Sequence, residues 1–341
     1  MNYIAFVLFL FSSQLFAYDD VRVAKNNPNL LKDFSFIENY QLKNKSTIAI
    51  IGDYAFTKEI NSILVNENEI PDNFIDDDNN GYIDDYLGID FNYLHGRFYT
   101  PFASGHENGI ISIVDSLIKH FQIDDKLKIL PINITTEKEV FDDLYIKKLA
   151  NAIDYARIRK VQVISMSLGI SNAYKSFFRF IDNNYDKSFK YLQDAIDRAN
   201  TDGIIILGAV SNDNLRDHIE DPTVPANSNG VIAVANVDYD GVIQSGYGKN
   251  VDMAYYGTDI FVWSGPGYEY VTEYELTKGS SLATPLVALS MAILKSLKPD
   301  VKYSKELMLN LHKSCDRKIE SKRNIISKCI YSPESFIQKN L

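Results

Sequence analysis

The sequence predicts an α/β protein whose mostly parallel sheet is flanked by helices. Short runs rich in β-branched residues alternate with amphipathic helical patterns along the chain. The runs are apolar on both faces, which is typical of parallel strands that are covered on both sides. At 341 residues with 45% hydrophobic content, the chain can bury one large core, in a domain of about 250 residues plus extensions.

Five strands and three helices can be placed from this pattern. The strand candidates are residues 47–51, 128–134, 161–168, 203–210 and 230–237. Apolar residues at helical spacing mark one helix over residues 110–121. Thr136 and Glu139 form a capping box that predicts the start of a second helix. A third helix carries apolar residues at helical spacing from Leu282 to Leu297 and ends at Lys298 and Pro299, and its Pro285 is expected in the first turn, where a missing N–H costs little.

Composition and the first residues narrow the class of protein. A formal net charge of −10 argues against nucleic-acid binding, which needs clustered Lys and Arg side chains. Residues 1–17 are apolar and end in the small Ala17, which predicts a signal peptide and therefore a secreted or periplasmic protein. A membrane anchor is the alternative for this segment, although it is short for a span. No later segment is expected to be apolar enough to cross a membrane.

Small and polar residues follow three of the predicted strands directly. They are Gly52 with Asp53, Ser167 with Leu168 and Gly169, and Ser211 with Asn212. In a parallel sheet, ligands and catalytic groups gather beyond the carboxyl ends of the strands, so these positions are the first candidates for a site. The segment after the first strand lacks the G-x-G-x-x-G pattern, which argues against a dinucleotide-binding oxidoreductase.

The third helix begins with the sequence KGSSLATP (278–285), which has two serines near its start. A serine at such a position can simply cap the free backbone N–H groups of the helix. It can also act as a nucleophile, provided that a proton acceptor and an oxyanion donor lie nearby. Residues elsewhere in the chain must decide between these two interpretations.

The segment GSSLATPLVA (279–288) resembles the nucleophile segment of the subtilisin-like serine peptidases, G-T-S-M-A-T-P-H-V-A, with Ser281 at the nucleophile position. Four further segments resemble family motifs in the family's order, at residues 69–91, 161–169, 203–213 and 231–257. The resemblance extends over roughly residues 35–300. It implies a subtilisin-like three-layer fold for residues 46–300, preceded by an N-terminal arm at residues 18–45.

The resemblance also implies roles for particular residues. Ser281 would attack a peptide carbonyl, and Asn212 would donate a hydrogen bond to the oxyanion that develops. Ser167, Leu168 and Gly169 match an edge along which an extended peptide pairs as an added strand. The expected partner is therefore a polypeptide substrate or a peptide ligand, and the implied activity is that of a serine endopeptidase.

Two positions depart from the family pattern. The family's catalytic Asp directly follows the first strand, where this chain has Gly52, and Asp53 comes one residue late. Successive strand residues point to opposite faces, so this shift turns the carboxylate away. In the segment that matches H-G-T-H-V-A-G-I-I-A, Ala103 takes the catalytic position and His106 matches the second histidine. The departures predict an impaired or absent triad, and a triad rebuilt from Asp53 and His106 is the alternative. The expected function is that of an exported serine endopeptidase with a displaced base, and the alternative is an inactive pseudoprotease that binds extended peptides or a partner protein.

An acidic loop forms a second candidate site that is independent of the serine. Its oxygen-bearing residues alternate as in a calcium loop, with a glycine at the turn. The candidate ligands are Asp76, Asp78, Asn80, the Tyr82 carbonyl and Asp84. Leu87 stands at the twelfth position instead of Glu, which rules out a complete EF-hand. A structural calcium ion is the expected cofactor, a solvated acidic turn is the alternative, and a structural calcium-binding surface protein is a third possible function.

The segment 301–341 is basic, in contrast to the acidic remainder of the chain. It is expected to dock onto the acidic domain, and a solvated helical tail is the alternative. Both cysteines of the chain, Cys315 and Cys329, lie in this segment. In an exported protein their spacing allows a disulfide, and two buried free thiols are the alternative.

Overall fold

The computed structural model describes the chain in several continuous stretches. These are residues 18–52, 60–96, 105–134, 143–170, 185–213, 223–266, 272–319 and 329–341, together with Ile325 and Ser327. The predicted signal peptide (1–17), Asp53, Ala103 and the capping box of Thr136 and Glu139 lie outside the described residues.

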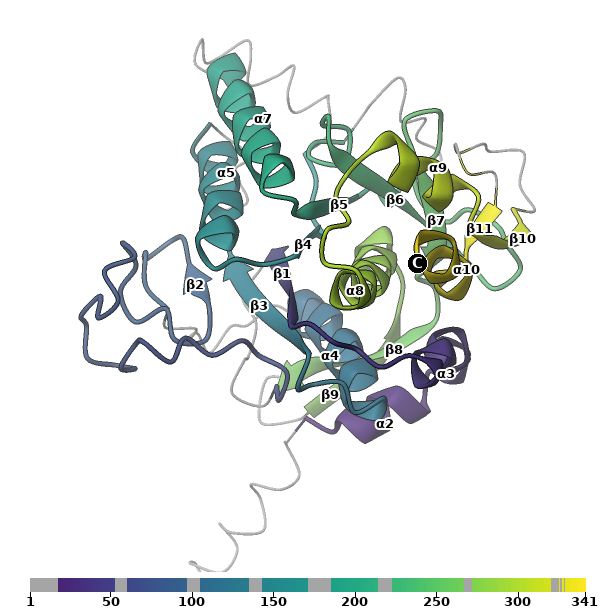
Figure 1. The fold of residues 1–341 in the computed structure, drawn as a ribbon, viewed down its shortest axis with the longest axis horizontal. Helices are drawn as coiled ribbons and strands as arrows, with labels where there is room; N and C mark the ends of the chain where they lie inside the picture. Colours follow the sequence, from purple (N-terminus) through teal and green to yellow (C-terminus); the bar gives the residue numbers. More distant parts are fainter. Residues whose placement is uncertain are drawn as a thin grey trace, which may run out of the picture.

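A sheet of nine strands, counted over the described residues, forms the centre of the molecule (Figure 1). Its strands in chain order are β1 (Ser46–Gly52), β2 (Ile89–Asp90), β3 (Leu127–Asn133), β4 (Val163–Met166), β5 (Ile205–Ala209), β6 (Val231–Val237), β7 (Met253–Tyr256), β10 (Cys315–Lys318) and β11 (Cys329–Tyr331). Across the sheet the order is β10-β11-β7-β6-β5-β4-β1-β3-β2, and among these strands only β10 pairs antiparallel, with β11. The five predicted strands are present, and the prediction of a mostly parallel sheet is confirmed.

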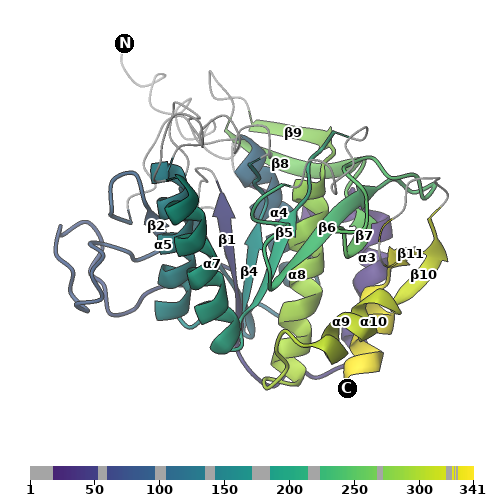
Figure 2. The same cartoon turned by 90° about the horizontal axis from the view of Figure 1, so that it is seen from above.

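Helices cover both faces of this sheet (Figures 1 and 2). One face carries α5 (Asp143–Ile158) and α7 (Tyr185–Thr201), and the other carries α4 (Gly105–His120) and α8 (Ser280–Leu297). Strand β1 contributes side chains to the hydrophobic cores on both faces of the sheet. Its Ile48 and Ile50 belong to the core shared with α4 and α8, whereas Ala49 and Ile51 belong to the core shared with α5 and α7. Strand residues alternate between faces, so a strand that is apolar throughout needs helices on both sides.

Helix α8 runs through one layer and is almost entirely buried (Figure 2). It begins at Ser280, so Pro285 is its sixth residue and lies in the second turn, and the prediction of a first-turn proline is wrong. By length and hydropathy, α8 would also suit a membrane span, which corrects the expectation that no later segment is apolar enough. Its burial against the sheet accounts for this apolar composition.

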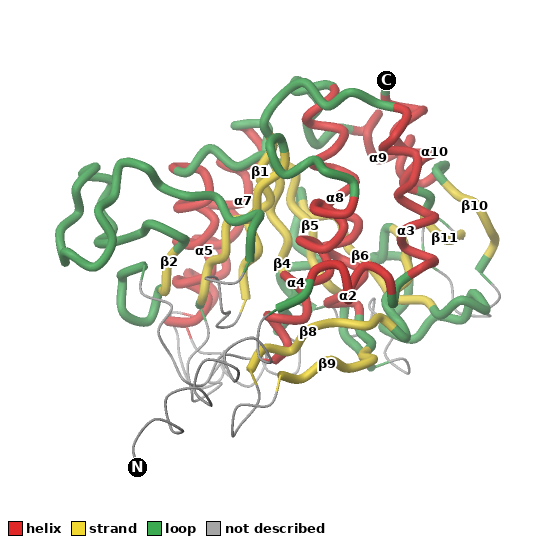
Figure 3. Tube along the Cα trace, turned by 90° about the horizontal axis from the view of Figure 1, so that it is seen from below, coloured by secondary structure: helices red, strands yellow, loops and turns green. Residues whose placement is uncertain are grey.

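Residues 60–88, which precede β2, run mostly as loops along one edge of the sheet, beside α5 (Figure 3). Tyr155 of α5 holds this segment in place. Its ring packs edge-on against Tyr82 with the centroids 4.8 Å apart, and its hydroxyl donates to Asp85 Oδ2 at 2.6 Å. Arg159 of the following turn donates to the same carboxylate oxygen at 2.9 Å. The acidic loop is therefore anchored to the helical layer.

The two ends of the described chain pack against the layer of α4 and α8. The N-terminal arm forms α2 (Asp20–Lys25), α3 (Pro28–Phe34) and the 3-10 helix η1 (Ser35–Asn39), and the C-terminal segment forms α9 (Lys305–His312) and α10 (Pro333–Asn340). A separate antiparallel pair consists of β8 (Ile260–Pro266) and β9 (Thr272–Thr277). Helices α2 and α4 contact each other, α4 also contacts β8, and α10 contacts both α8 and α3.

The C-terminal segment docks through apolar side chains. Phe336 and Ile337 of α10 are fully buried and belong to the same core as α8. A disulfide between Cys315 and Cys329 joins β10 to β11. The predictions of a docked segment and of a disulfide are both confirmed. Burial of apolar surface favours this docking, and Nε2 of His312 in the segment also lies 3.4 Å from Oδ1 of Asp252 in the body.

Candidate active site

Ser281 lies in the first turn of α8, close to the carboxyl ends of β4 and β5, and it is 6% exposed. An added Cβ at Gly279 would lie 2.9 Å from Ser281 Oγ and 3.3 Å from Asn212 Nδ2. The serine hydroxyl and the amide therefore border the same small space. This space stays open because residue 279 has no side chain.

The neighbouring serine, Ser280, has a structural role. Its hydroxyl donates to the Val210 carbonyl oxygen at 2.5 Å, and its N–H donates to Asn212 Oδ1 at 2.8 Å. The N-cap of α8 is Gly279, which has no side chain of its own, and Asn212 Oδ1 accepts from the first N–H of the helix instead. The capping interpretation is therefore wrong for both serines. Ser280 instead holds the amide oxygen of Asn212, which leaves Nδ2 available to another acceptor.

Ser167 connects the predicted substrate edge to α8. Pro285 lacks the N–H that would otherwise bond to the Ser281 carbonyl oxygen, four residues earlier in the helix. The Ser167 hydroxyl donates to this oxygen at 2.8 Å instead. Beyond Ser167, Leu168 is half-buried and Gly169 is exposed. This edge after β4 is therefore accessible to an extended peptide.

The acidic and basic groups near the end of β1 come from α4. Asp53 lies outside the described residues. The side chain of His106 is 46% exposed, and its Nδ1 lies 3.7 Å from Glu107 Oε2. Glu107 is 2% exposed, and its carboxylate covers Gly52, because an added Cβ at Gly52 would lie 2.8 Å from Glu107 Cδ. The helix thus brings a carboxylate to Gly52, the last residue of β1.

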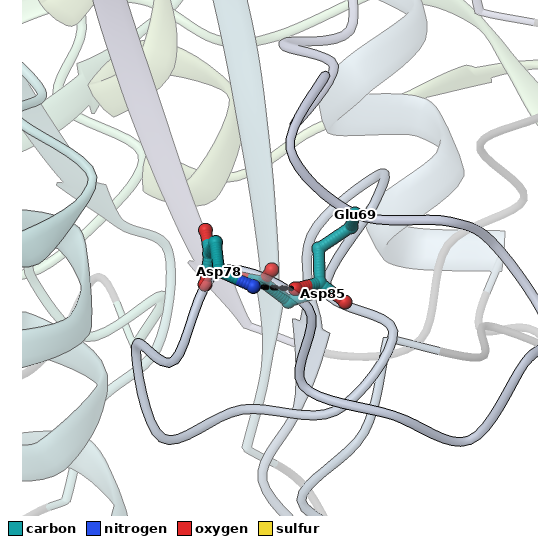
Figure 4. Close-up of side chains that lie close together, drawn as sticks. All are labelled: Glu69, Asp78 and Asp85. Atoms are coloured by element: carbon teal, nitrogen blue, oxygen red, sulfur yellow. Dashed lines mark hydrogen bonds between the residues drawn. The ribbon is translucent and has the colours of Figure 1, made fainter.

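Three carboxylates converge in the loop that precedes β2 (Figure 4). Oxygen atoms of Glu69, Asp78 and Asp85 all lie within 4.8 Å of one another. Glu69 and Asp85 are buried, at 3% and 0% exposure. Burial is the main cause that raises the pKa of Glu69, and the charges of Asp85 and Asp78 add to it. A set of converging carboxylate oxygens suits a hard divalent cation such as Ca²⁺.

Most of the calcium ligands predicted from the sequence bind backbone donors in this structure. The carboxylate of Asp76 accepts from the N–H of Asn80, and that of Asp84 accepts from two N–H groups of the preceding turn. The Asn80 side-chain oxygen accepts from the N–H of Tyr82. Of the predicted set, Asp78 is the residue that joins the converging carboxylates.

The arrangement around α8 defines a class of protein. A serine at a helix start, an amide donor beside it and an accessible strand edge are the parts of a serine hydrolase site on an α/β scaffold. A family model described as the subtilase family matches residues 31–321, which includes the first part of the C-terminal segment. The chain belongs to the subtilase family.

Individual relatives share only limited sequence identity with this chain. The thermostable alkaline protease of Halalkalibacterium halodurans is 30% identical over 156 residues, which are 44% of this chain and 36% of that protein. Subtilisin-like protease 1 of Plasmodium berghei is 25% identical over 291 residues, which are 81% of this chain and 46% of that protein. This chain thus matches less than half the length of either relative. The crystal structure of a lanthipeptide protease matches with a TM-score of 0.64 at 17% identity, over 93% of this chain and 95% of that one, and it shows the shared fold.

Sequence reasoning missed three residues of these sites. Glu69 and Asp85 lie 16 positions apart within the motif 69–91, and the alternating pattern of a calcium loop does not include them. Glu107 directly follows His106 in the sequence. Nothing in the sequence links Gly52 to Glu107. The packing of α4 against β1 brings the two residues together.

Proposed function

We propose that this protein is an exported serine endopeptidase that cleaves extended polypeptides through Ser281. The observation that carries the proposal is the space at Gly279 that the Ser281 hydroxyl and the Asn212 amide share. In this space the hydroxyl can attack a peptide carbonyl while the amide donates to the developing oxyanion. The exposed edge at Gly169 supports a substrate in an extended conformation.

A fluorophosphonate probe tests this proposal, because it reacts with an activated serine hydroxyl. We expect the wild-type protein to be labelled and Ser281→Ala to be unlabelled. Ser280→Ala is the matched control and should keep its label, because the backbone N–H of residue 280, which this change leaves in place, still donates to Asn212 Oδ1. Asn212→Ala should cleave a peptide about a hundredfold to a thousandfold more slowly. A folded wild-type protein that takes up no label would contradict the proposal.

A catalytically inactive protein that binds extended peptides is the second candidate. Gly52 favours it, because the residue at the end of β1 offers no carboxylate to orient an imidazole. A serine that lacks its proton acceptor loses about a millionfold in turnover. Two results together would favour this candidate. The wild-type protein would take up no fluorophosphonate, and it would bind a fluorescent extended peptide without cleaving it, as measured by anisotropy. Cleavage that disappears in Ser281→Ala would exclude it.

A bound calcium ion in the acidic loop is part of the proposed function. Glu69, Asp78 and Asp85 would supply its carboxylate ligands, in place of most of the set predicted from the sequence. The Oε2 atom of Glu69 is buried and has no hydrogen-bond partner among the described residues. A cation there would satisfy this oxygen and offset the charges of Glu69 and Asp78, while Asp85 already pairs with Arg159 at 2.9 Å.

Thermal unfolding with and without calcium tests this assignment. At a calcium concentration of a hundred times Kd, binding should add about 2.7 kcal/mol of stability and raise the Tm. Glu69→Gln should remove this response. Asp76→Asn is the control that separates the two ligand sets, because Asp76 is not one of the three converging carboxylates and its change should leave the calcium response intact. A response lost in Asp76→Asn and kept in Glu69→Gln would favour the ligands predicted from the sequence.

Export from the cytoplasm completes the proposal. The disulfide between Cys315 and Cys329 supports an oxidising compartment. Tyr18, the first residue after the predicted signal peptide, packs on Trp263 with the ring centroids 5.2 Å apart. N-terminal sequencing of the mature protein should therefore begin at Tyr18. An uncleaved chain that accumulates with reduced cysteines would contradict export.

A further inference from the structure

The end of β1 and the start of α4 share the space for one carboxylate. Gly52 is the last residue of β1 and has no side chain to contribute. An added Cβ there would lie 2.8 Å from Cδ and 2.9 Å from Oε1 of Glu107, which is closer than real carbon contacts allow. The Glu107 carboxylate therefore fills the volume that a side chain at residue 52 would need. A side chain at residue 52 and the Glu107 carboxylate in its present position therefore exclude each other.

The same carboxylate lies beside an imidazole that reaches solvent. Glu107 is 2% exposed and His106 is 46% exposed, and the closest nitrogen and oxygen atoms are 3.7 Å apart. A buried negative charge favours a proton on a neighbouring imidazole and fixes its orientation. The separation is longer than a hydrogen bond, and catalytic hydrogen bonds are commonly long before substrate binds and tighten in the complex.

We propose that Glu107 is the positioning acid of this site and that it orients His106 for proton transfer with Ser281, in place of a carboxylate at residue 52. The inference rests on the proposed function. As the Ser281 Oγ bonds to the peptide carbonyl carbon, the hydroxyl proton passes to Nε2 of His106. That proton then passes to the amine nitrogen as the C–N bond breaks. Glu107 stays ionised and accepts a hydrogen bond from Nδ1–H of His106.

A carboxylate exchange tests the shared space, independently of catalysis. Gly52→Asp alone should lower the Tm, because its side chain overlaps Glu107 and adds a second buried negative charge. Glu107→Val vacates the space. In the double variant Gly52→Asp with Glu107→Val, the loss of Tm caused by the aspartate should largely disappear. Changes in Tm that simply add would overturn the inference, because residues that compete for one space do not behave additively.

Two further measurements test the orienting role. In Glu107→Gln the imidazole of His106, assigned with His106→Asn and followed by NMR, should titrate at a lower pH than in the wild type, because a nearby carboxylate is removed. Asp115→Asn is the matched control: it removes a buried acid eight residues, or about 12 Å, further along the same helix. It should leave this titration unchanged. Fluorophosphonate labelling should be at least about tenfold slower in Glu107→Gln, and the double exchange variant should recover part of the rate.

The outcomes separate the inference from the proposed function. A wild-type protein that takes up no label contradicts the peptidase, and the His106 titration then still reports whether Glu107 acts on the imidazole. An unchanged titration in Glu107→Gln overturns the inference even if the wild-type protein is labelled. Labelling of Glu107→Gln at the wild-type rate also overturns it.

Discussion

Burial sets the behaviour of individual carboxyl groups in this protein. Asp115 of α4 is fully buried, and its Oδ1 accepts from the N–H of Ser62 at 2.9 Å. Burial raises the pKa of Asp115 and outweighs the hydrogen bonds from Ser62 and Tyr18, which lower it. The folded protein therefore binds a proton at Asp115 more readily than the unfolded chain does.

This difference predicts how stability depends on pH. An acid whose pKa is raised by folding contributes stability at low pH, and this contribution is lost as the pH rises above its unfolded value of 3.8. Each pKa unit corresponds to about 1.4 kcal/mol. We expect Asp115→Asn, whose amide oxygen can still accept from Ser62, to show a smaller fall in unfolding free energy between pH 4 and pH 7 than the wild type.

Chemical denaturation across this pH range measures the effect. Asp125→Asn is a suitable control, because the Asp125 side chain is 69% exposed and should not change the profile. Identical pH profiles for the wild type and Asp115→Asn would show that burial of this acid does not affect stability.

At the scale of elements, a side chain that follows strand β4 completes the hydrogen bonding in the first turn of α8. Pro285 deprives the Ser281 carbonyl oxygen of its helical donor, and Ser167, which follows β4, replaces that donor. The proline and the serine thus attach the first turn of α8 to the end of β4. The same contact joins the candidate nucleophile to the candidate substrate edge, so changes at one should affect the other.

We expect Ser167→Ala to destabilise the protein by about 1–3 kcal/mol, because it leaves a buried carbonyl oxygen without a donor. Ser165→Ala is the matched control. Its hydroxyl is buried two residues earlier and has no hydrogen-bond partner among the described residues, so its loss should cost little. Adding Pro285→Ala to Ser167→Ala should recover part of the stability by restoring the N–H donor. Equal melting temperatures for Ser167→Ala and Ser165→Ala would contradict this account.

At the scale of the whole molecule, the C-terminal segment extends the sheet and closes the core. Strand β11 pairs with β7 and continues the parallel sheet, while α10 covers α8. The disulfide between Cys315 and Cys329 links the two strands at this edge, across a sequence separation of 14 residues. The segment is therefore part of the domain that carries the site.

Removal of this disulfide should destabilise the whole domain. A loop of this length corresponds to about 3 kcal/mol of stabilisation in the chain-entropy estimate. The double variant Cys315→Ala with Cys329→Ala should unfold at a correspondingly lower denaturant concentration, and the wild-type protein should match it after reduction. A variant that unfolds at the same denaturant midpoint as the oxidised wild type would indicate that the disulfide does not stabilise the domain.

The sequence by itself determined the architecture and the position of the serine. Runs that are apolar on both faces require a parallel sheet between helices, and the order of motifs around Ser281 and Asn212 identified the family. These features are local, because the periodicity of a segment records which of its faces is buried. The same reasoning could not place Pro285 within its helix, because the start of a helix depends on the caps that its neighbours provide.

Only the tertiary structure decided which side chains meet. Glu107 covers Gly52, Ser167 reaches the Ser281 carbonyl oxygen, and Glu69 joins Asp85, although the members of each pair lie between 16 and 114 positions apart in the sequence. No pattern within a segment encodes these contacts. They depend on how α4 and α8 are seated on the sheet and how the acidic loop folds back on itself, and close packing leaves room for one arrangement of the side chains.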